Sequence, residues 1–299
     1  MIETTTNKPT KFEIWVLAGR PKTLLAAAVP VIVGTAIAIN DSSFKPLAAF
    51  AALICSLLIQ IGTNYVNDLY DFKKGADNDG RTGPQRALAS GLLSVTEMKT
   101  GIAVTFITAF LMGLYLVYIG GWLILLIGVA SIAAGFAYTA GPFPLAYNGL
   151  GDIFVFIFFG LVATTGTYFV QTGEISLLSF WASVPVGALI TNILVVNNYR
   201  DIDQDRIANK NTLAVKWGKR FTRFQYLFFM IISYVTPFVV FATFKDSVFV
   251  FLPLLSIPLS VKLVRMIYML EGQELNKTLE LTAKLSGIYG LLFAIGILV

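Results

Sequence analysis

The chain has 299 residues, of which 56% are hydrophobic and only 13% are charged, and its formal net charge is +5. A soluble globular protein carries about 25% charged residues, so the excess apolar surface of this chain must face lipid. The mean hydropathy of +0.75 agrees, and a soluble enzyme is excluded. The chain contains no His and a single Cys, Cys55, which excludes His-based acid–base chemistry, most zinc sites, His-bound haem and disulfides.

Nine apolar stretches have the length of a transmembrane helix, about 17–25 residues. They predict an all-α, polytopic membrane protein that forms one integral membrane domain over residues 1–299. Pro30 interrupts the first stretch and Lys284 enters the last. The expected spans are 22–40, 46–66, 98–118, 121–139, 151–170, 178–197, 222–243, 247–266 and 281–299.

The distribution of Lys and Arg tests this count, because cytoplasmic loops of membrane proteins are enriched in positive charge. The segments on the N-terminal side of the membrane hold 20 of the 22 Lys and Arg residues, and the opposite side holds only Lys45 and Lys245. We therefore expect nine spans, a cytoplasmic N-terminus and a location in the plasma membrane (the inner membrane of a bacterium). The positive charge reflects topology and attraction to membrane lipid or a diphosphate, and it argues against nucleic acid as a partner.

An N-terminal signal peptide is the alternative interpretation of residues 11–38. A basic start precedes an apolar run that ends in Ala36-Ile-Ala38, as in a signal peptide. Its removal would delete one span and invert the charge distribution just described. A first transmembrane span fits the sequence better.

Two Asp-rich segments each follow a long apolar run. One contains Asn67 and Asp71, and the other contains Asn197 and Asp201, with Asp205 four residues further on. Residues four apart share a helix face, so each segment can present a column of oxygen ligands. Such columns suit Mg²⁺ ions that bridge to a phosphate-bearing substrate. Solvated loop charge is the alternative, but two copies at matched positions argue against it.

These two segments occupy equivalent places in a weak internal repeat. Expected spans one to four and five to eight each carry Asn-x-x-x-Asp at the end of their second span, followed by a basic loop. Repeats in membrane proteins commonly form a site at their interface. We therefore expect the Asp-rich segments to face each other across a central cavity, on the cytoplasmic side.

The first segment, Asn67-Asp-x-x-Asp71-x-x-x-Gly75-x-Asp77, resembles the first aspartate motif of the UbiA superfamily of intramembrane prenyltransferases. Asp201-x-x-x-Asp205, followed by KNTL at 210–213, resembles the second motif, and the likeness extends over essentially the whole chain. Three further stretches resemble the 1,4-dihydroxy-2-naphthoate polyprenyltransferases of menaquinone synthesis. They are RPKTL at 20–24, TGPQRALASG at 82–91 and YTAGPFPLAYNGLGD at 138–152.

The resemblance implies that a polyprenyl diphosphate binds through two Mg²⁺ ions, which neutralise the departing pyrophosphate. Asn67, Asp71 and Asp77 would hold one ion, and Asp201 and Asp205 the other. The expected catalytic residues are Asp71, Asp201, Asp205 and Lys210. Charge-assisted hydrogen bonds to phosphate are expected from Lys73, Arg86, Arg206 and Lys210, with topogenic charge as the alternative for each.

The resemblance also implies that 1,4-dihydroxy-2-naphthoate attacks the allylic cation at the carbon that bears its carboxylate, which leaves as CO₂ to give a demethylmenaquinol. Tyr138 and Tyr147 are expected in the substrate site, and Asp152 is either a site residue or a helix cap. Cations that could orient the carboxylate are Arg20, Lys22 and Arg200. Aromatic rings that could stabilise the allylic cation are Tyr65, Tyr70 and Tyr138, with packing as the alternative.

Three alternative functions remain. Within the superfamily, the acceptor could be 4-hydroxybenzoate, homogentisate, protohaem or a lipid glyceryl phosphate. A CDP-alcohol phosphotransferase would carry Asp-Gly-x-x-Ala-Arg within one compact motif, which this chain lacks. A divalent-cation or small-molecule transporter would place acidic residues near the middle of its spans, whereas the clusters here lie at span ends.

Overall fold

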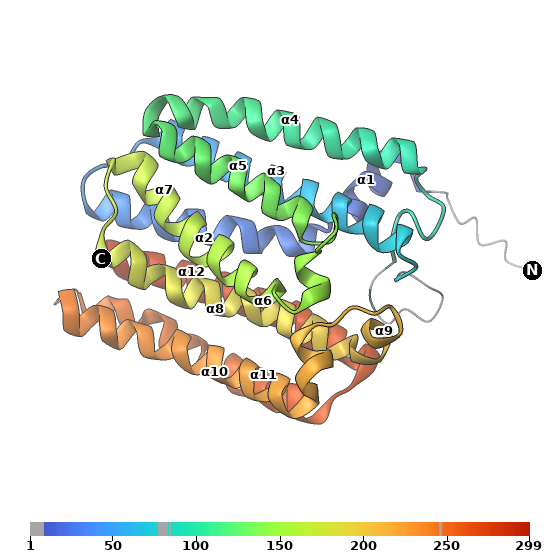
Figure 1. Ribbon diagram of the computed structural model, residues 1–299. Helices are drawn as coiled ribbons and strands as arrows, with labels where there is room; N and C mark the ends of the chain where they lie inside the picture. Colours follow the sequence, from blue (N-terminus) through green and yellow to red (C-terminus); the bar gives the residue numbers. More distant parts are fainter. Residues whose placement is uncertain (1–8, 77–82, 84, 245–246) are drawn as a thin grey trace, which may run out of the picture.

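The computed structural model describes residues 9–76, 83, 85–244 and 247–299, and within these residues all regular structure is helical (Figure 1). The first half contains α1 (Lys11–Gly19), α2 (Pro21–Asn40), α3 (Pro46–Lys73), α4 (Val95–Gly120), α5 (Trp122–Ala137), η1 (Leu145–Asn148), α6 (Gly151–Val155), η2 (Phe156–Val162) and α7 (Ala163–Thr172). The second half contains α8 (Leu177–Arg200), α9 (Ile202–Ile207), α10 (Leu213–Phe244), η3 (Val248–Ser256), α11 (Ile257–Met269), η4 (Gly272–Glu274) and α12 (Leu275–Leu298).

All nine predicted spans coincide with a helix or an unbroken series of helices. Within the described residues, eight of these spans are long and apolar enough to cross a membrane. The remaining span, α5, is a shorter apolar helix of 16 residues. The segments α6–η2–α7, η3–α11 and η4–α12 each form one span. The protein is therefore an integral membrane protein. Pro30 lies inside α2 without ending it, and α12 accommodates Lys284.

Proline and glycine set several helix ends. Pro21 and Pro46 occupy the first turns of α2 and α3, where the missing N–H has no intrahelical partner to lose. Gly121 connects α4 to α5, and Gly173 ends α7 with a φ of 88°. Glycine adopts these positive φ values without the steric cost that a side chain would bring, so the turns between neighbouring spans stay short.

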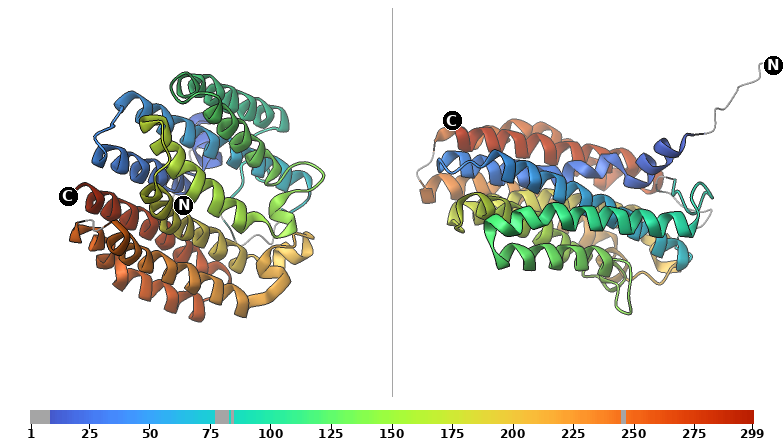
Figure 2. Two further views of the ribbon diagram at one scale, coloured as in Figure 1. Left: turned by 60° about the vertical axis from the view of Figure 1, so that its left-hand side comes forward. Right: turned by 90° about the horizontal axis from the view of Figure 1, so that it is seen from above.

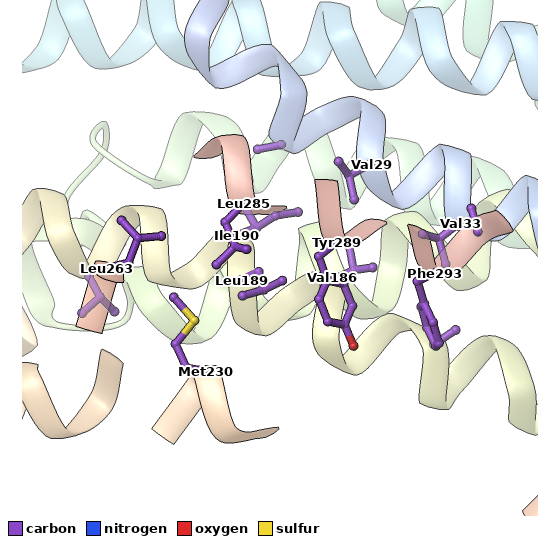
Figure 3. Close-up of a cluster of buried hydrophobic side chains, with 14 of the residues drawn as sticks. Val29, Val33, Val186, Leu189, Ile190, Met230, Leu263, Leu285, Tyr289 and Phe293 are labelled. Atoms are coloured by element: carbon purple, nitrogen blue, oxygen red, sulfur yellow. The ribbon is translucent and has the colours of Figure 1, made fainter. Parts of the chain in front are cut away.

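The main apolar core lies where α2, α8 and α12 pack together, with α10 and α11 against them (Figure 3). Val29 of α2, Leu189 of α8 and Tyr289 of α12 are buried in this cluster. The helices run side by side as a bundle, with α4 and α10 on opposite sides of it (Figures 1 and 2). The C-terminal ends of α3 and α8, together with α9, lie at the same end of the bundle, which we call the aspartate end.

The segment η2 is π-helical, a form that often marks functional sites, and it packs very closely on α8. A Cβ on Gly160 of η2 would lie 2.7 Å from the Cα of Gly187, which is closer than a real Cβ contact. Small residues permit such close approach of helix backbones in membranes. The two glycines therefore allow η2 to pack directly against α8 of the apolar core.

Gly160→Ala is expected to lower the thermal unfolding midpoint in detergent, because the added methyl group must push η2 away from α8. Overpacking of this kind costs about 1–3 kcal/mol. The matched control is Gly128→Ala in α5, where an added Cβ would meet nothing within 4 Å, and its midpoint should equal that of the wild type. A Gly160→Ala midpoint as high as that of the control would contradict the close packing.

Candidate active site

The last turns of α3 carry the first Asp-rich segment. Asn67 and Asp71 are buried, at 9% and 5% exposure. Asp71 accepts hydrogen bonds from the Tyr147 hydroxyl at 2.9 Å and from the Arg86 guanidinium at 3.4 Å. Asn67 Oδ1 accepts from the Thr139 hydroxyl at 2.9 Å. These contacts turn Asn67 and Asp71 towards the loop that follows α5.

Asp68 has a different role. Its side chain is 1% exposed and accepts a hydrogen bond from the backbone N–H of Ala87 at 3.2 Å. It therefore anchors the segment before α4. Asp77, which we expected to complete this metal site, lies outside the described residues.

The second Asp-rich segment bends at Asp201. We expected one helical column, but α8 ends at Arg200 and α9 begins at Ile202. The i to i−4 backbone bonds continue through the bend, since Asp201 N donates to Asn197 O at 3.1 Å and Asp205 N donates to Asp201 O at 2.8 Å. The column is therefore bent but not interrupted.

Arg200 forms a bidentate ion pair with its neighbour Asp201. Its Nε and one terminal nitrogen donate to the two carboxylate oxygens at 2.7 and 2.6 Å. The remaining terminal nitrogen donates to Asn276, and Asn197 accepts a further bond. We expected Arg200 to orient an acceptor carboxylate, but its donors are committed to Asp201 and two amides. In this structure Arg200 holds Asp201 in place.

Buried Asp205 and partly buried Lys210 form a second ion pair, with 3.4 Å between the ammonium and one carboxylate oxygen. The other oxygen, Oδ2, is buried and has no hydrogen-bond partner among the described residues. Burial raises the pKa of Asp205 to about 6, against the opposing charge of Lys210. Burial disfavours the charged form of Lys210, but the carboxylates of Asp205, Asp71 and Asp201 outweigh it and raise the pKa of Lys210. The negative charges of both Asp-rich segments therefore act on Lys210.

Tyr147 links the two segments through the loop after α5. Its hydroxyl donates to Asp71, and its carbonyl accepts from the backbone N–H of Asn211 at 3.0 Å. The ammonium groups of Lys74 and Lys210 lie 4.1 and 5.7 Å from the centre of its ring. Burial and the neighbouring Asp71 carboxylate raise the pKa of Tyr147, so its hydroxyl remains a donor. The predicted approach of the two segments is thus built around this one aromatic ring.

Replacing Tyr147 by Phe should lower kcat by about tenfold. The exchange removes one hydrogen bond to a carboxylate, an interaction worth about 1.5–3 kcal/mol, and releases Asp71 from the loop. Steady-state kinetics across a Mg²⁺ titration would measure the effect. An unchanged kcat at every Mg²⁺ concentration would mean that Tyr147 does not position Asp71.

The structure separates the remaining candidates. Arg20 and Tyr138 lie near the site, since the charge of Arg20 acts on Asp68 and on Tyr138, and burial followed by the nearby carboxylates raises the pKa of Tyr138. Lys73 is exposed and lies over the ring of Tyr70, and Arg206 is exposed and pairs with Asp203 at 3.6 Å. Tyr65 packs edge-on against Trp15, and exposed Lys22 pairs with Glu280. None of these last contacts reaches an aspartate of the site.

Two more residues join the site: Lys74, which the sequence did not single out, and Asp152, for which the sequence left a site role and a helix cap open. Lys74 donates to the carbonyl of Thr139 at 2.7 Å and covers the Tyr147 ring, and Thr139 bonds Asn67. Lys74 sits in a basic pair with Lys73, both are exposed, and the sequence gives no sign of which lysine contacts the loop after α5. Asp152 is buried, with Oδ1 unpaired among the described residues, so it is more than an exposed helix cap.

The oxygen-rich donor set suits Mg²⁺, although no single all-protein cage is present. Among the described residues, no three Asp, Glu, Cys or His side chains are grouped so that they could hold one metal ion. Mg²⁺ is usually bound by one or two carboxylates together with substrate phosphates. The unpaired Asp205 Oδ2, the amide of Asn67 and the carboxylates of Asp71 and Asp201 fit this mode of binding.

An apolar cavity of about 210 Å³ meets the charged site at Tyr138, which is near Asp71 and Asp205, although none of the aspartates described above lines it. Its walls come from α3, α4, α5 and the α6–η2–α7 span, and Tyr138 lines it. Exposed apolar side chains such as Leu114 and Val129 also line it. The cavity therefore provides an apolar chamber that reaches the charged site at Tyr138, and it is distinct from the space between the two Asp-rich segments.

Comparison with known proteins identifies this combination of fold and site. Residues 27–288 match the model of the UbiA prenyltransferase family. The chain belongs to this family. It is 36% identical to the 1,4-dihydroxy-2-naphthoate octaprenyltransferase of Escherichia coli (strain K12), over 98% of this chain and 97% of that protein. It is also 33% identical to UbiA prenyltransferase domain-containing protein 1 of Xenopus tropicalis, over 98% of this chain and 85% of that protein.

The fold is that of solved members of the UbiA family. The structure of a UbiA homolog from Archaeoglobus fulgidus bound to GPP and Mg²⁺ superposes with a TM-score of 0.68 at 16% sequence identity. The alignment covers 95% of this chain and 99% of that chain. The arrangement of spans expected from the sequence is therefore confirmed as that of a UbiA-family prenyltransferase.

Proposed function

We propose that this UbiA-family prenyltransferase transfers a polyprenyl group from a polyprenyl diphosphate to 1,4-dihydroxy-2-naphthoate. The products are a demethylmenaquinol, CO₂ and pyrophosphate. The observation that carries the proposal is the meeting of Asp71, Asp205 and Lys210 around Tyr147, beside an apolar cavity. The choice of acceptor is supported by the identity to the Escherichia coli naphthoate enzyme over nearly the whole chain.

The buried aspartates would hold Mg²⁺ for the diphosphate. Asn67, Asp71 and the sequence candidate Asp77 would bind one ion, and Asp201 with Asp205 the other. Bound Mg²⁺ would act as a Lewis acid that neutralises charge on the leaving pyrophosphate. The Archaeoglobus homolog bound to GPP and Mg²⁺ supports this donor and metal.

The basic residues of the site would bind phosphate oxygens directly. Arg86 is buried and Lys210 partly buried beside the aspartates, where they can form charge-assisted hydrogen bonds. Arg200 would act through Asp201, because its donors are already committed. Arg206 and Lys73 would attract the anionic donor from the surface.

The apolar cavity would hold the beginning of the prenyl tail and keep water from the allylic cation. Exposed apolar residues in its lining give the tail a path to the bilayer, so a long chain need not fit inside the protein. The ring of Tyr138 lines the cavity near the aspartates, where its negative face could stabilise the cation. Arg20, near Tyr138, is the cation best placed for the acceptor carboxylate.

The aspartate end would face the cytoplasm, where a water-soluble naphthoate and the diphosphate head group are both accessible. The excess of Lys and Arg in the loops at this end supports that orientation. The protein would then reside in the plasma membrane, the inner membrane in a bacterium.

An assay with parallel acceptors tests the proposed function. Purified protein would receive Mg²⁺, geranylgeranyl diphosphate and either 1,4-dihydroxy-2-naphthoate, 4-hydroxybenzoate or homogentisate, with prenylated product followed by mass spectrometry. We expect product from the naphthoate alone. Product from another ring would support prenyltransferase activity but assign a different acceptor. No product from any ring would reject aromatic prenylation.

A further inference from the structure

Polar side chains in the cavity wall fall into two groups. In the first group, the side-chain hydroxyl already donates a hydrogen bond to a backbone carbonyl. Ser56, Ser131 and Thr167 donate in this way to Ala27, Ile127 and Ala163, at 2.7–2.8 Å. Gln60 and Thr63 of α3 are different. The Gln60 amide nitrogen donates to Thr23 at 3.2 Å, but its oxygen has no partner among the described residues. The Thr63 hydroxyl likewise bonds no described residue.

Neither of these two oxygen atoms is sealed inside the protein. Both residues line the cavity, and neither polar atom is among those buried without a partner. Helix threonines usually return their hydroxyl to the carbonyl four residues earlier, as Thr167 does here. Thr63 does not, so its hydrogen-bonding capacity remains available to whatever occupies the cavity.

The neighbouring helix α5 packs directly against the Thr63 hydroxyl. A Cβ on Gly135 of α5 would lie only 2.5 Å from Thr63 Oγ1, so any larger residue there would press on the hydroxyl. Glycine at this point keeps the oxygen in place at the cavity wall. The position is therefore built to present a polar group, and not merely to tolerate one.

Gln60 and Thr63 precede the first Asp-rich segment on α3 by one to two helical turns. Thr63 is four residues before Asn67, one helical turn or about 6 Å along the axis, and Gln60 is about 4.5 Å further. Tyr138, which lines the same cavity, lies near the aspartates. Gln60 and Thr63 thus lie between the charged site and the deep apolar part of the cavity.

An unsatisfied polar group at membrane depth is costly, and a prenyl chain cannot relieve that cost because it has no polar atoms. A hydroxylated aromatic ring can. Its hydroxyls would bond Gln60 and Thr63 while its faces contact the apolar wall. A pocket that hydrogen-bonds a substrate hydroxyl strongly rejects analogues that lack it.

We propose that Gln60 and Thr63 bind the ring hydroxyls of the aromatic acceptor and determine which ring is accepted. The inference rests on the proposed function, and it adds two acceptor-binding residues to the aspartate site. The prenyl tail occupies the apolar remainder of the cavity beyond them.

Steady-state kinetics with the full-length enzyme, Mg²⁺, geranylgeranyl diphosphate and 1,4-dihydroxy-2-naphthoate tests this proposal. In Thr63→Val and Gln60→Leu, the KM for the acceptor should rise about tenfold, as expected for one lost hydrogen bond, while the KM for the donor stays unchanged. Thr63→Ser, which keeps the hydroxyl, should retain the wild-type values. The matched control is Thr105→Val in α4, outside the cavity, where the hydroxyl bonds the Gly101 carbonyl at 2.7 Å.

A monohydroxylated inhibitor adds a second readout. The inhibition constant of 1-hydroxy-2-naphthoate, which lacks one ring hydroxyl, should rise less than the acceptor KM in one of the two variants. Unchanged acceptor KM in both variants, or equal increases for donor and acceptor, would overturn the proposal. Thermal unfolding midpoints would show that the variants are folded.

Failure of the proposed function would look different. It would show as a wild-type enzyme that makes no product from the naphthoate. If the wild type prenylates another hydroxylated ring, the same variants should raise the KM for that ring. If it prenylates no aromatic ring, the assignment of Gln60 and Thr63 falls together with the function.

Discussion

Asp205→Asn is expected to reduce kcat by at least about 10³-fold, which corresponds to about 4 kcal/mol. Asp205 is buried, and one of its oxygens has no partner among the described residues, so that oxygen is available as a ligand for a cation. The exchange keeps the shape of the side chain and removes its charge. It also leaves Lys210 without its closest counter-ion. Single-turnover measurements with purified protein would separate this loss from slow product release.

The same helix supplies the control for Asp205. Asp203 lies two residues away in α9, and its side chain is 85% exposed. Asp203→Asn should therefore keep wild-type turnover. Equal losses in the two variants would indicate general disturbance of α9, and equal retention would mean that Asp205 is not part of the metal site.

Asp71→Asn is expected to cause a loss of similar size and to raise the Mg²⁺ concentration needed for half-maximal activity. Asp71 is the point where α3, Tyr147 and Arg86 meet. Its charge is both a proposed metal ligand and the counter-ion of the guanidinium. Activity measured across a Mg²⁺ titration would resolve the two effects.

A second carboxylate bonded by a tyrosine provides a matched control. Asp41, which ends α2 at the opposite end of the bundle, accepts a hydrogen bond from the Tyr168 hydroxyl at 2.7 Å. Asp41→Asn should keep both turnover and the Mg²⁺ requirement. Retained activity in Asp71→Asn at ordinary Mg²⁺ concentrations would rule out its assigned role.

The transmembrane layout could be predicted because it depends on chain-wide physical constraints. A span needs a minimum apolar length, and loop charge follows membrane orientation, so both leave a readable pattern. Asn67 and Asp71 were also predictable, because spacing by four on a continuous helix fixes which side chains share a face.

The details of the site depended on tertiary contacts that leave no periodic signal. The bend at Asp201 and the pairing of Arg200 with Asp201 arise where α8 meets α9 and α12. The contact of Lys74, and not of its likewise exposed neighbour Lys73, with the Thr139 carbonyl depends on the loop after α5. Gln60 and Thr63 looked like ordinary polar residues of a span, because the sequence cannot show which hydroxyls already have partners.

The stoichiometry of one reaction distinguishes Mg²⁺-dependent decarboxylating prenyl transfer from the other reactions considered above. Purified wild-type protein would be incubated with geranylgeranyl diphosphate and carboxyl-labelled 1,4-dihydroxy-2-naphthoate, with Mg²⁺ or with a chelator. We predict equal amounts of prenylated product, labelled CO₂ and pyrophosphate with Mg²⁺, and none of the three with the chelator. Prenylated product that retains the label, or product formed equally in the chelator, would contradict a Mg²⁺-dependent decarboxylating prenyl transfer.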